Sequence, residues 1–185
     1  GFMKSWTSGK YTAPSYTADK VSDMPSVVSV EKCWSRPGFL QIGFADEAMA
    51  YATKEYYLPG SYSINIGERL KEMGLSKADL TVTFRAAGLT TAFGENGNAE
   101  PVLSATTGTV SDGGNVVLTP DQWKDYSFSI TGADQTTVLT IASNSTTAGA
   151  LSGKPDNRFF IDDIVVRAEA ATAKPLVLSF DFTVE

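Results

Sequence analysis

The chain has 185 residues, enough for one domain with a sizeable core, and its 42% hydrophobic and 19% charged residues, without long Leu/Glu/Lys helical runs, are typical of a β-rich globular protein. The formal net charge of −6 argues against a nucleic-acid partner, because neutralising phosphates requires clustered Lys and Arg. There is no histidine, so the commonest general base and metal ligand is missing and most enzyme classes lose their support.

Several short runs place an apolar side chain at every second position, which predicts strands that bury one face. These runs are Val28 and Val30; Leu40, Ile42 and Phe44; Tyr62, Ile64 and Ile66; and Leu80, Val82, Phe84 and Ala86. Turn-forming residues separate them at 37–38, 59–60, 94–98 and 112–115. This spacing favours antiparallel sheets over βαβ units.

Between these runs, residues 67–73 (GERLKEM) predict one short helix, which ends at Gly74. Ser76–Asp79 has a spacing similar to a capping box, and we expect one further turn there. Cys33 is the only cysteine, so an intrachain disulfide and a cysteine-based zinc site are excluded. We expect Cys33 to be a small, half-buried thiol.

Two later segments, 123–130 (WKDYSFSI) and 157–167 (NRFFIDDIVVR), read as a hairpin-like pair of strands. After the small-residue segment 168–174, apolar residues alternate again up to Val184. We therefore predict a module at 1–170, followed at 171–185 by a connector and a terminal strand that either completes the sandwich or begins a following module. No stretch of about 20 apolar residues occurs, so we expect no membrane span.

Some of these segments carry a resemblance to a known family. They are 2–6 (FMKSW), 37–43 (PGFLQIG), 80–87 (LTVTFRAA), 123–132 (WKDYSFSITG) and 160–166 (FIDDIVV). Together they resemble galactose-binding-like jelly-roll modules, which are frequent in secreted or surface proteins of gut Bacteroidetes. The resemblance implies an all-β, antiparallel β-sandwich of jelly-roll type and an extracellular, cell-surface or periplasmic location.

In that family the first strand often reads like Phe-Asp-Phe, and here this pattern stands at 180–182, near the end of the chain. One hypothesis is that Leu176–Val184 fills the first-strand position, within its own chain or by exchange with a neighbour. The alternative is an ordinary last strand.

The adjacent carboxylates Asp162 and Asp163 interrupt an apolar strand. They could supply ligands to a structural calcium, because related sandwiches often carry one near this strand. Successive strand residues point to opposite faces, however, so both can face one ion only through a bulge or twist. The alternative is that one acid accepts backbone N–H bonds while the other faces solvent. No other cofactor is expected.

A glycosidase would need two carboxyl groups facing each other across a cleft. Acidic residues that could serve are present, namely Asp46, Glu47, Glu55, Glu68, Glu95 and Glu100. Each lies near a turn or polar run, where solvated carboxylates are expected. We therefore predict a protein that is not an enzyme.

Sugar binding without hydrolysis requires no such pair of carboxyl groups. It needs an aromatic platform and a few polar groups. Trp34 and Arg36 form a minimal site, in which the guanidinium could bind hydroxyls or a uronate. The nearby Tyr11, Tyr16 and Tyr56 lie outside the clean strand pattern and are further surface platforms. The alternative for Trp34 is that its ring covers one end of the sandwich. Trp123 is expected to plug one end of the core.

The sequence thus favours a non-catalytic carbohydrate-binding module that recognises a glycan or glycoconjugate by stacking and hydrogen bonding, tethered to other domains of a longer protein. The alternative is a structural or adhesive spacer whose surface contacts other protein domains.

Overall fold

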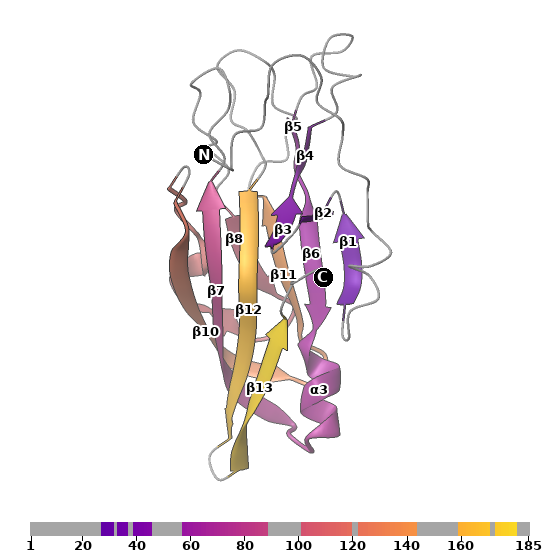
Figure 1. The fold of residues 1–185 in the computed structure, drawn as a ribbon. Helices are drawn as coiled ribbons and strands as arrows, with labels where there is room; N and C mark the ends of the chain where they lie inside the picture. The colour runs from indigo at the N-terminus through magenta and orange to yellow at the C-terminus, as the bar shows by residue number, and fades with distance from the viewer. Residues whose placement is uncertain are drawn as a thin grey trace, which may run out of the picture.

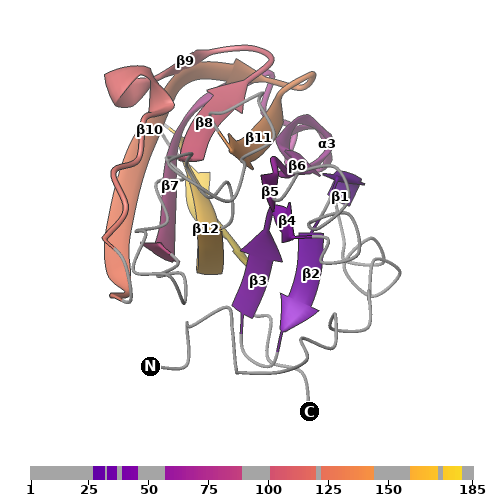
Figure 2. The same ribbon diagram turned by 90° about the horizontal axis from the view of Figure 1, so that it is seen from above.

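The protein is described here by a computed structural model, which covers residues 27–31, 33–36, 39–45, 57–88, 101–119, 122–143, 159–170 and 173–180. Within these residues, two antiparallel sheets pack face to face, and a short helix lies at one end (Figure 1). Figure 2, seen from above, separates the two layers. These two antiparallel sheets confirm the all-β, antiparallel sandwich predicted from the sequence.

The smaller sheet has four strands in the order β1-β6-β11-β8. Their bounds are Val27–Glu31 (β1), Ser61–Asn65 (β6), Val138–Ser143 (β11) and Pro101–Ala105 (β8). Every pairing within this sheet is antiparallel.

The larger sheet has seven strands, in the order β2-β3-β12-β7-β10-β9, with β13 paired to β12. Their bounds are Cys33–Arg36 (β2), Phe39–Ile42 (β3), Phe159–Ala170 (β12), Lys77–Gly88 (β7), Lys124–Asp134 (β10), Thr109–Val110 (β9) and Ala173–Phe180 (β13). A separate pair is formed by Phe44–Ala45 (β4) and Tyr57–Leu58 (β5), and a 3-10 turn, η1, covers Ser111–Gly114.

From β6 to β12, successive long strands alternate between the sheets. The chain passes from β6 in the small sheet to β7 in the large one, then to β8, β10, β11 and β12, changing sheet at each step. Within this stretch, the long strands that pair in one sheet are therefore far apart in the sequence, and the chain crosses between the two layers at each step.

The core lies between the sheets, where both contribute buried side chains. On β7 the inward-facing Leu80, Val82 and Phe84 are at most 2% exposed, and the Phe84 ring stacks on those of Tyr126 and Phe128 at 5.6 and 6.0 Å. Burying a side chain of this size contributes about 1.5–3 kcal/mol relative to leaving it in water. The alternating pattern of the sequence therefore fixed which face of β7 became the core.

The small sheet adds Tyr62 and its neighbours to this core. Tyr62 is fully buried, and burial, together with the nearby Cys33, raises the pKa of its phenol. The Cys33 thiol donates to the carbonyl of Ser61 at 3.2 Å. Cys33 is 0% exposed rather than half-buried, because it lies on the inner face of the edge strand β2.

Helix α3 (Ile66–Glu72) confirms the predicted helix to within a residue at each end. The Asn65 side chain caps its start by accepting from the Glu68 N–H at 3.0 Å. Gly74, with φ of 71°, ends it in a Schellman motif, in which the Gly74 N–H binds Lys71 O and the Leu75 N–H binds Leu70 O. In the part of the chain that the structure describes, no helix is long and apolar enough to cross a bilayer.

Two predictions about the strands and their connections are wrong. The segments around β10 and β12 do not form a hairpin, because β7 lies between them and pairs with both. The turn expected at Ser76–Asp79 is absent, since Lys77 already begins β7. There Asp79 accepts the Gly132 N–H at 2.8 Å and so stabilises the partner strand.

The terminal strand β13 pairs with β12 of its own chain. It occupies the same edge of β12 as β3 does, because β3 pairs with residues 159–161 and β13 with 164–170, while β7 runs along the other edge. A β-bulge in β12 at Asp162 and Asp163 marks the point where one partner strand gives way to the other. Figure 1 shows β13 beside the lower half of β12. Residues 181–185 lie outside the described residues.

Candidate functional site

The outer face of the large sheet, which points away from the small sheet, carries the alternate residues of β12, β7 and β10. The strand register aligns them in rows across the three strands. One row is charged and consists of Asp162, Arg85 and Asp125. The next row consists of small side chains, those of Val165, Thr83 and Ser127.

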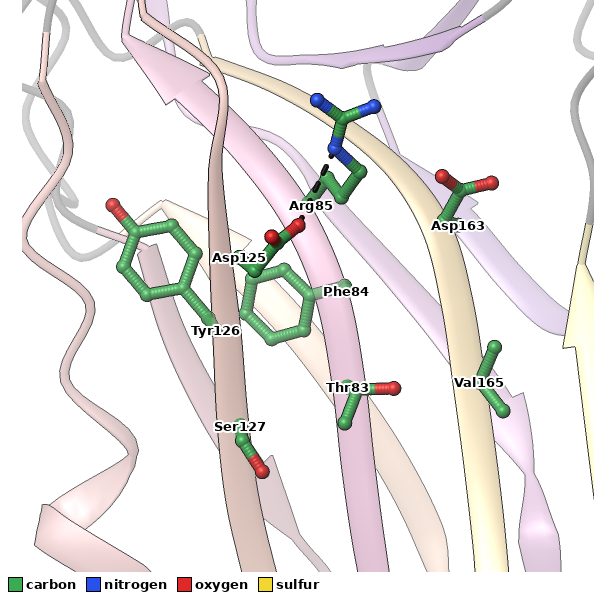
Figure 3. A pocket seen from close by; sticks show the side chains of 8 residues that line it. All are labelled: Thr83, Phe84, Arg85, Asp125, Tyr126, Ser127, Asp163 and Val165. Carbon is green, nitrogen blue, oxygen red and sulfur yellow. Dashed lines mark ion pairs between the residues drawn. The ribbon is translucent and has the colours of Figure 1, made fainter.

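This arrangement leaves a groove over the sheet, with a volume of about 380 Å³. Its lining consists of Thr83, Phe84, Arg85, Asp125, Tyr126, Ser127, Asp163 and Val165. Figure 3 shows the charged side chains at one end and the small ones at the other. The hollow exists because the small side chains of the second row do not fill the space beside the longer charged ones.

The charged end is held by an ion pair. Arg85 Nε lies 3.3 Å from Asp125 Oδ1, with side-chain exposures of 47% and 88% respectively. On the inner side of the sheet, where the Tyr126 ring stacks on Phe84, the Tyr126 hydroxyl donates to the Val117 carbonyl at 2.8 Å, and partial burial raises the pKa of this phenol. On the outer face, the groove therefore offers the Arg85 guanidinium and the Thr83 and Ser127 hydroxyls as donors beside the Asp125 and Asp163 carboxylates as acceptors.

An aromatic cluster adjoins the charged end on the same outer face. It comprises Phe39 of β3, Phe160 of β12 and Trp123, just before β10, packed over Ala87. Phe39 makes edge-on contacts with Trp123 at 5.7 Å and with Phe160 at 5.0 Å, and Phe160 is only 5% exposed. Trp123 therefore does not plug the main core, as the sequence suggested, because it packs on the opposite side of the sheet.

Arg85 connects the groove to this cluster. Its guanidinium carbon lies 5.9 Å from the centroid of the Trp123 ring, within the range of a cation–π contact. The same side chain thus lines the groove, binds Asp125 and lies over the indole.

The bulge at Asp162 and Asp163 turns the second carboxylate toward the groove. Asp163 has a φ of 50°, its N–H donates to Asp162 Oδ1 at 2.8 Å, and its side chain is exposed. Two carboxylates supply only part of the six to eight oxygen ligands that calcium takes. Among the described residues, no group of three or more His, Cys, Asp or Glu is placed to hold a metal ion, and the calcium site stays a prediction.

Of the other residues predicted from the sequence, Trp34 and Arg36 fall in the edge strand β2. Their register positions are opposite Gln41 and Phe39 of β3, and Phe39 belongs to the aromatic cluster. Tyr11, Tyr16 and Tyr56 lie outside the described residues, as do the carboxylates at 46, 47, 55, 95 and 100. Glu68 is exposed on α3, in the first turn of the helix.

Sequence reasoning missed Arg85, Asp125 and Thr83. The signal was present, since each is a polar member of an alternating run whose apolar members were used to identify the strand. The pattern shows that such residues face away from the core, but only the strand order brings them together.

No family model matches this chain, and searches of curated proteins and of solved structures gave no match.

Proposed function

We propose that the chain is a non-catalytic carbohydrate-binding module of jelly-roll type and that a glycan binds in the outer-face groove. The observation that carries the proposal is the groove itself, which places Arg85, Asp125, Thr83 and Ser127 around one hollow beside an aromatic cluster. The jelly-roll part is supported by the alternation of successive strands between the two sheets.

The chemistry of the groove suits a sugar. A pyranose presents hydroxyls that donate and accept in several directions, together with an apolar ring face. Asp125 and Asp163 supply acceptors, Arg85 supplies donors, and the Thr83 and Ser127 hydroxyls supply both. Val165 and the methyl group of Thr83 add apolar surface. A shallow, solvent-exposed groove of this kind favours weak binding, which tethering to other domains would strengthen by avidity.

The proposed site extends toward the residues first predicted from the sequence. Trp34 and Arg36 occupy register positions on β2 next to those of Gln41 and Phe39 on β3. An extended glycan lying across the strands from β10 toward β2 would pass over the aromatic cluster. We therefore include Trp34 and Arg36 as the far end of the proposed site, and we place the module outside the cytoplasm, where such glycans occur.

Hydrolysis is not proposed. The groove contains two carboxylates, Asp125 and Asp163, but an acid that protonates a leaving group needs burial among apolar side chains. Asp125 is 88% exposed and paired with Arg85, and Asp163 is exposed. Both are suited to accept hydrogen bonds from hydroxyls.

The test is electrophoretic retardation in native gels that contain soluble plant and host polysaccharides. Wild type is compared with Thr83→Trp, which fills the groove, and with its matched control Thr81→Trp. Thr81 is partly buried like Thr83 and lies two residues away on the same face of β7, but it does not line the groove. Trp34→Ala tests the far end of the site.

We expect at least one glycan to retard wild type and Thr81→Trp but not Thr83→Trp. Equal loss in both tryptophan variants would mean that the groove is not the site. If no glycan retards the wild type, the proposal fails, and a spacer that contacts protein domains becomes the leading function.

A further inference from the structure

We propose that Arg85 is a displaceable cover of Trp123 and that the indole face beneath it is the stacking platform for the pyranose ring. This inference rests on the proposed glycan-binding function. It assigns a role to two residues that the sequence did not indicate as ligand contacts.

The orientation of the indole is fixed by the aromatic cluster. Trp123 meets Phe39 with ring centroids 5.7 Å apart and planes at 66°, and Phe39 in turn meets Phe160 at 5.0 Å and 69°. Phe160 is 5% exposed, so this end of the cluster is firmly packed. A stacking platform requires such support, because a ring that is already ordered loses little freedom when a ligand binds.

The cover, by contrast, is weakly held. Arg85 Cζ lies 5.9 Å from the indole centroid, near the outer limit for a cation–π contact. Its ion pair with Asp125 spans 3.3 Å, and the two side chains are 47% and 88% exposed. Exposed pairs of this kind contribute little, so a ligand can displace the guanidinium from the ring at small cost.

A ligand in the groove would meet Arg85 first, because Arg85 lines the groove at its charged end and also reaches the indole. Figure 3 shows the guanidinium extending beyond Asp125, away from Thr83 and Val165. A sugar ring that replaces it over Trp123 gains apolar contact with the indole. The displaced guanidinium stays tethered to β7 and can donate to the sugar's hydroxyls.

The first measurement is acrylamide quenching of Trp123 fluorescence without ligand. The chain has three tryptophans, so Trp6→Phe and Trp34→Phe together leave Trp123 as the only one. In this background we compare Arg85→Ala with its matched control Arg167→Ala. Arg167 is an exposed residue of β12 on the same face, and it does not line the groove.

We expect Arg85→Ala to raise the quenching constant about twofold and Arg167→Ala to leave it unchanged, because a cation–π cover shields the indole from collisions. An unchanged constant in Arg85→Ala would overturn the cover. This step needs no glycan, so its outcome is independent of the proposed function.

The second measurement adds a polysaccharide that retards both the wild type and the Trp6→Phe, Trp34→Phe background in native gels, so that loss of the proposed contact at Trp34 is excluded before quenching is measured. Saturating glycan should bring the quenching constants of the Arg85→Ala protein and its parent to the same low value. If the glycan binds but leaves Trp123 in Arg85→Ala fully quenchable, the platform is elsewhere, and the inference fails while the proposed function stands. If no glycan retards the wild type, the proposed function is rejected, and the stacking role of Trp123 is rejected with it.

If the doubly substituted background does not fold, the wild type labelled with 5-fluorotryptophan replaces it. The ¹⁹F resonance of Trp123 is assigned by its disappearance in Trp123→Phe. It should shift in Arg85→Ala, and again when glycan is added. If the chemical shift of Trp123 changed neither in Arg85→Ala nor on addition of glycan, the inference would be contradicted.

Discussion

The two faces of strand β7 have different roles, since one packs in the core and the other lines the groove. Toward the small sheet, Leu80, Val82 and Phe84 are at most 2% exposed and form the core. Toward solvent, Thr83 and Arg85 line the groove. The core side chains and the groove side chains are thus attached to the same strand backbone. The packed inner face therefore positions the outer side chains, while the stability of the fold does not depend on them. Substitutions on the two faces should therefore separate stability from binding.

The largest effect is expected at the centre of the inner face. We expect Phe84→Ala to lower the free energy of unfolding by about 4 kcal/mol, because it removes a ring stacked between Tyr126 and Phe128 and leaves a cavity. Urea denaturation measures the change. The adjacent Thr83→Ala should cost no more than about 0.5 kcal/mol. Similar losses in both variants would show that the two faces are not separate.

The aromatic cluster tests whether the outer face also contributes to stability. We expect Phe160→Ala to cost about 2–3 kcal/mol, less than Phe84→Ala, because Phe160 is 5% exposed but belongs to a smaller cluster with partly exposed neighbours. Guanidinium denaturation gives the free energy, and near-UV circular dichroism reports the loss of ring packing. A cost equal to that of Val165→Ala would mean that the cluster is loosely packed.

The turn between β10 and β11 is polar but structural. Asp134 accepts hydrogen bonds from the Thr136 hydroxyl at 2.7 Å, the Thr136 N–H at 2.8 Å and the Thr107 hydroxyl at 3.0 Å. These bonds, the one to the Thr136 side chain first, hold the pKa of this carboxyl below its ordinary value.

A carboxyl whose pKa is lowered by folding stabilises the protein above its unfolded pKa of about 3.9 and loses that contribution as the pH falls through the folded pKa. We expect Asp134→Asn to lower the melting temperature at pH 7, and the difference from wild type to shrink below about pH 4. Thermal melts from pH 7 to pH 2.5 measure this. Asp79→Asn is the control for a carboxylate that accepts one N–H bond. A difference that is constant with pH would contradict the prediction.

Only a small effect on stability is expected at the ion pair. Asp125→Asn should change the free energy of unfolding by less than about 1 kcal/mol, because the pair is exposed. It should nevertheless weaken glycan retardation in native gels, since it removes a groove carboxylate and releases Arg85. A loss of stability without any change in retardation would reverse the roles assigned to the two faces.

Much of the fold was predictable. Strands β1, β3, β6, β7 and β10 were each found from alternating residues, β12 from its apolar run, and α3 from the pattern at 67–73 and Gly74. Strands β2, β8 and β11 were not predicted. In β2, the residues on either side of the fully buried Cys33 gave no clean alternation. A short edge strand owes its conformation to its partner more than to its own residues.

The candidate site was far less predictable. Trp34 and Arg36 were chosen because aromatic and cationic residues stood together in the sequence, whereas Arg85, Asp125 and Asp163 come from three different strands. Asp162 and Asp163 were recognised as unusual, and the strand has a bulge at this point, with Asp163 in the lining of the groove. That Asp163 enters the groove depends on its φ of 50°, which no residue pattern specified.

The sequence by itself determined the side-chain period, and with it the antiparallel strands and the identity of the core residues, because burial of alternate apolar side chains is a local property of each strand. Only the tertiary structure decided that β7 lies between β12 and β10. That order depends on long-range pairing, in which the register of one strand is set by residues far away in the chain. The groove is a product of that register, because it exists only where a charged row and a row of small side chains from three separate strands come side by side.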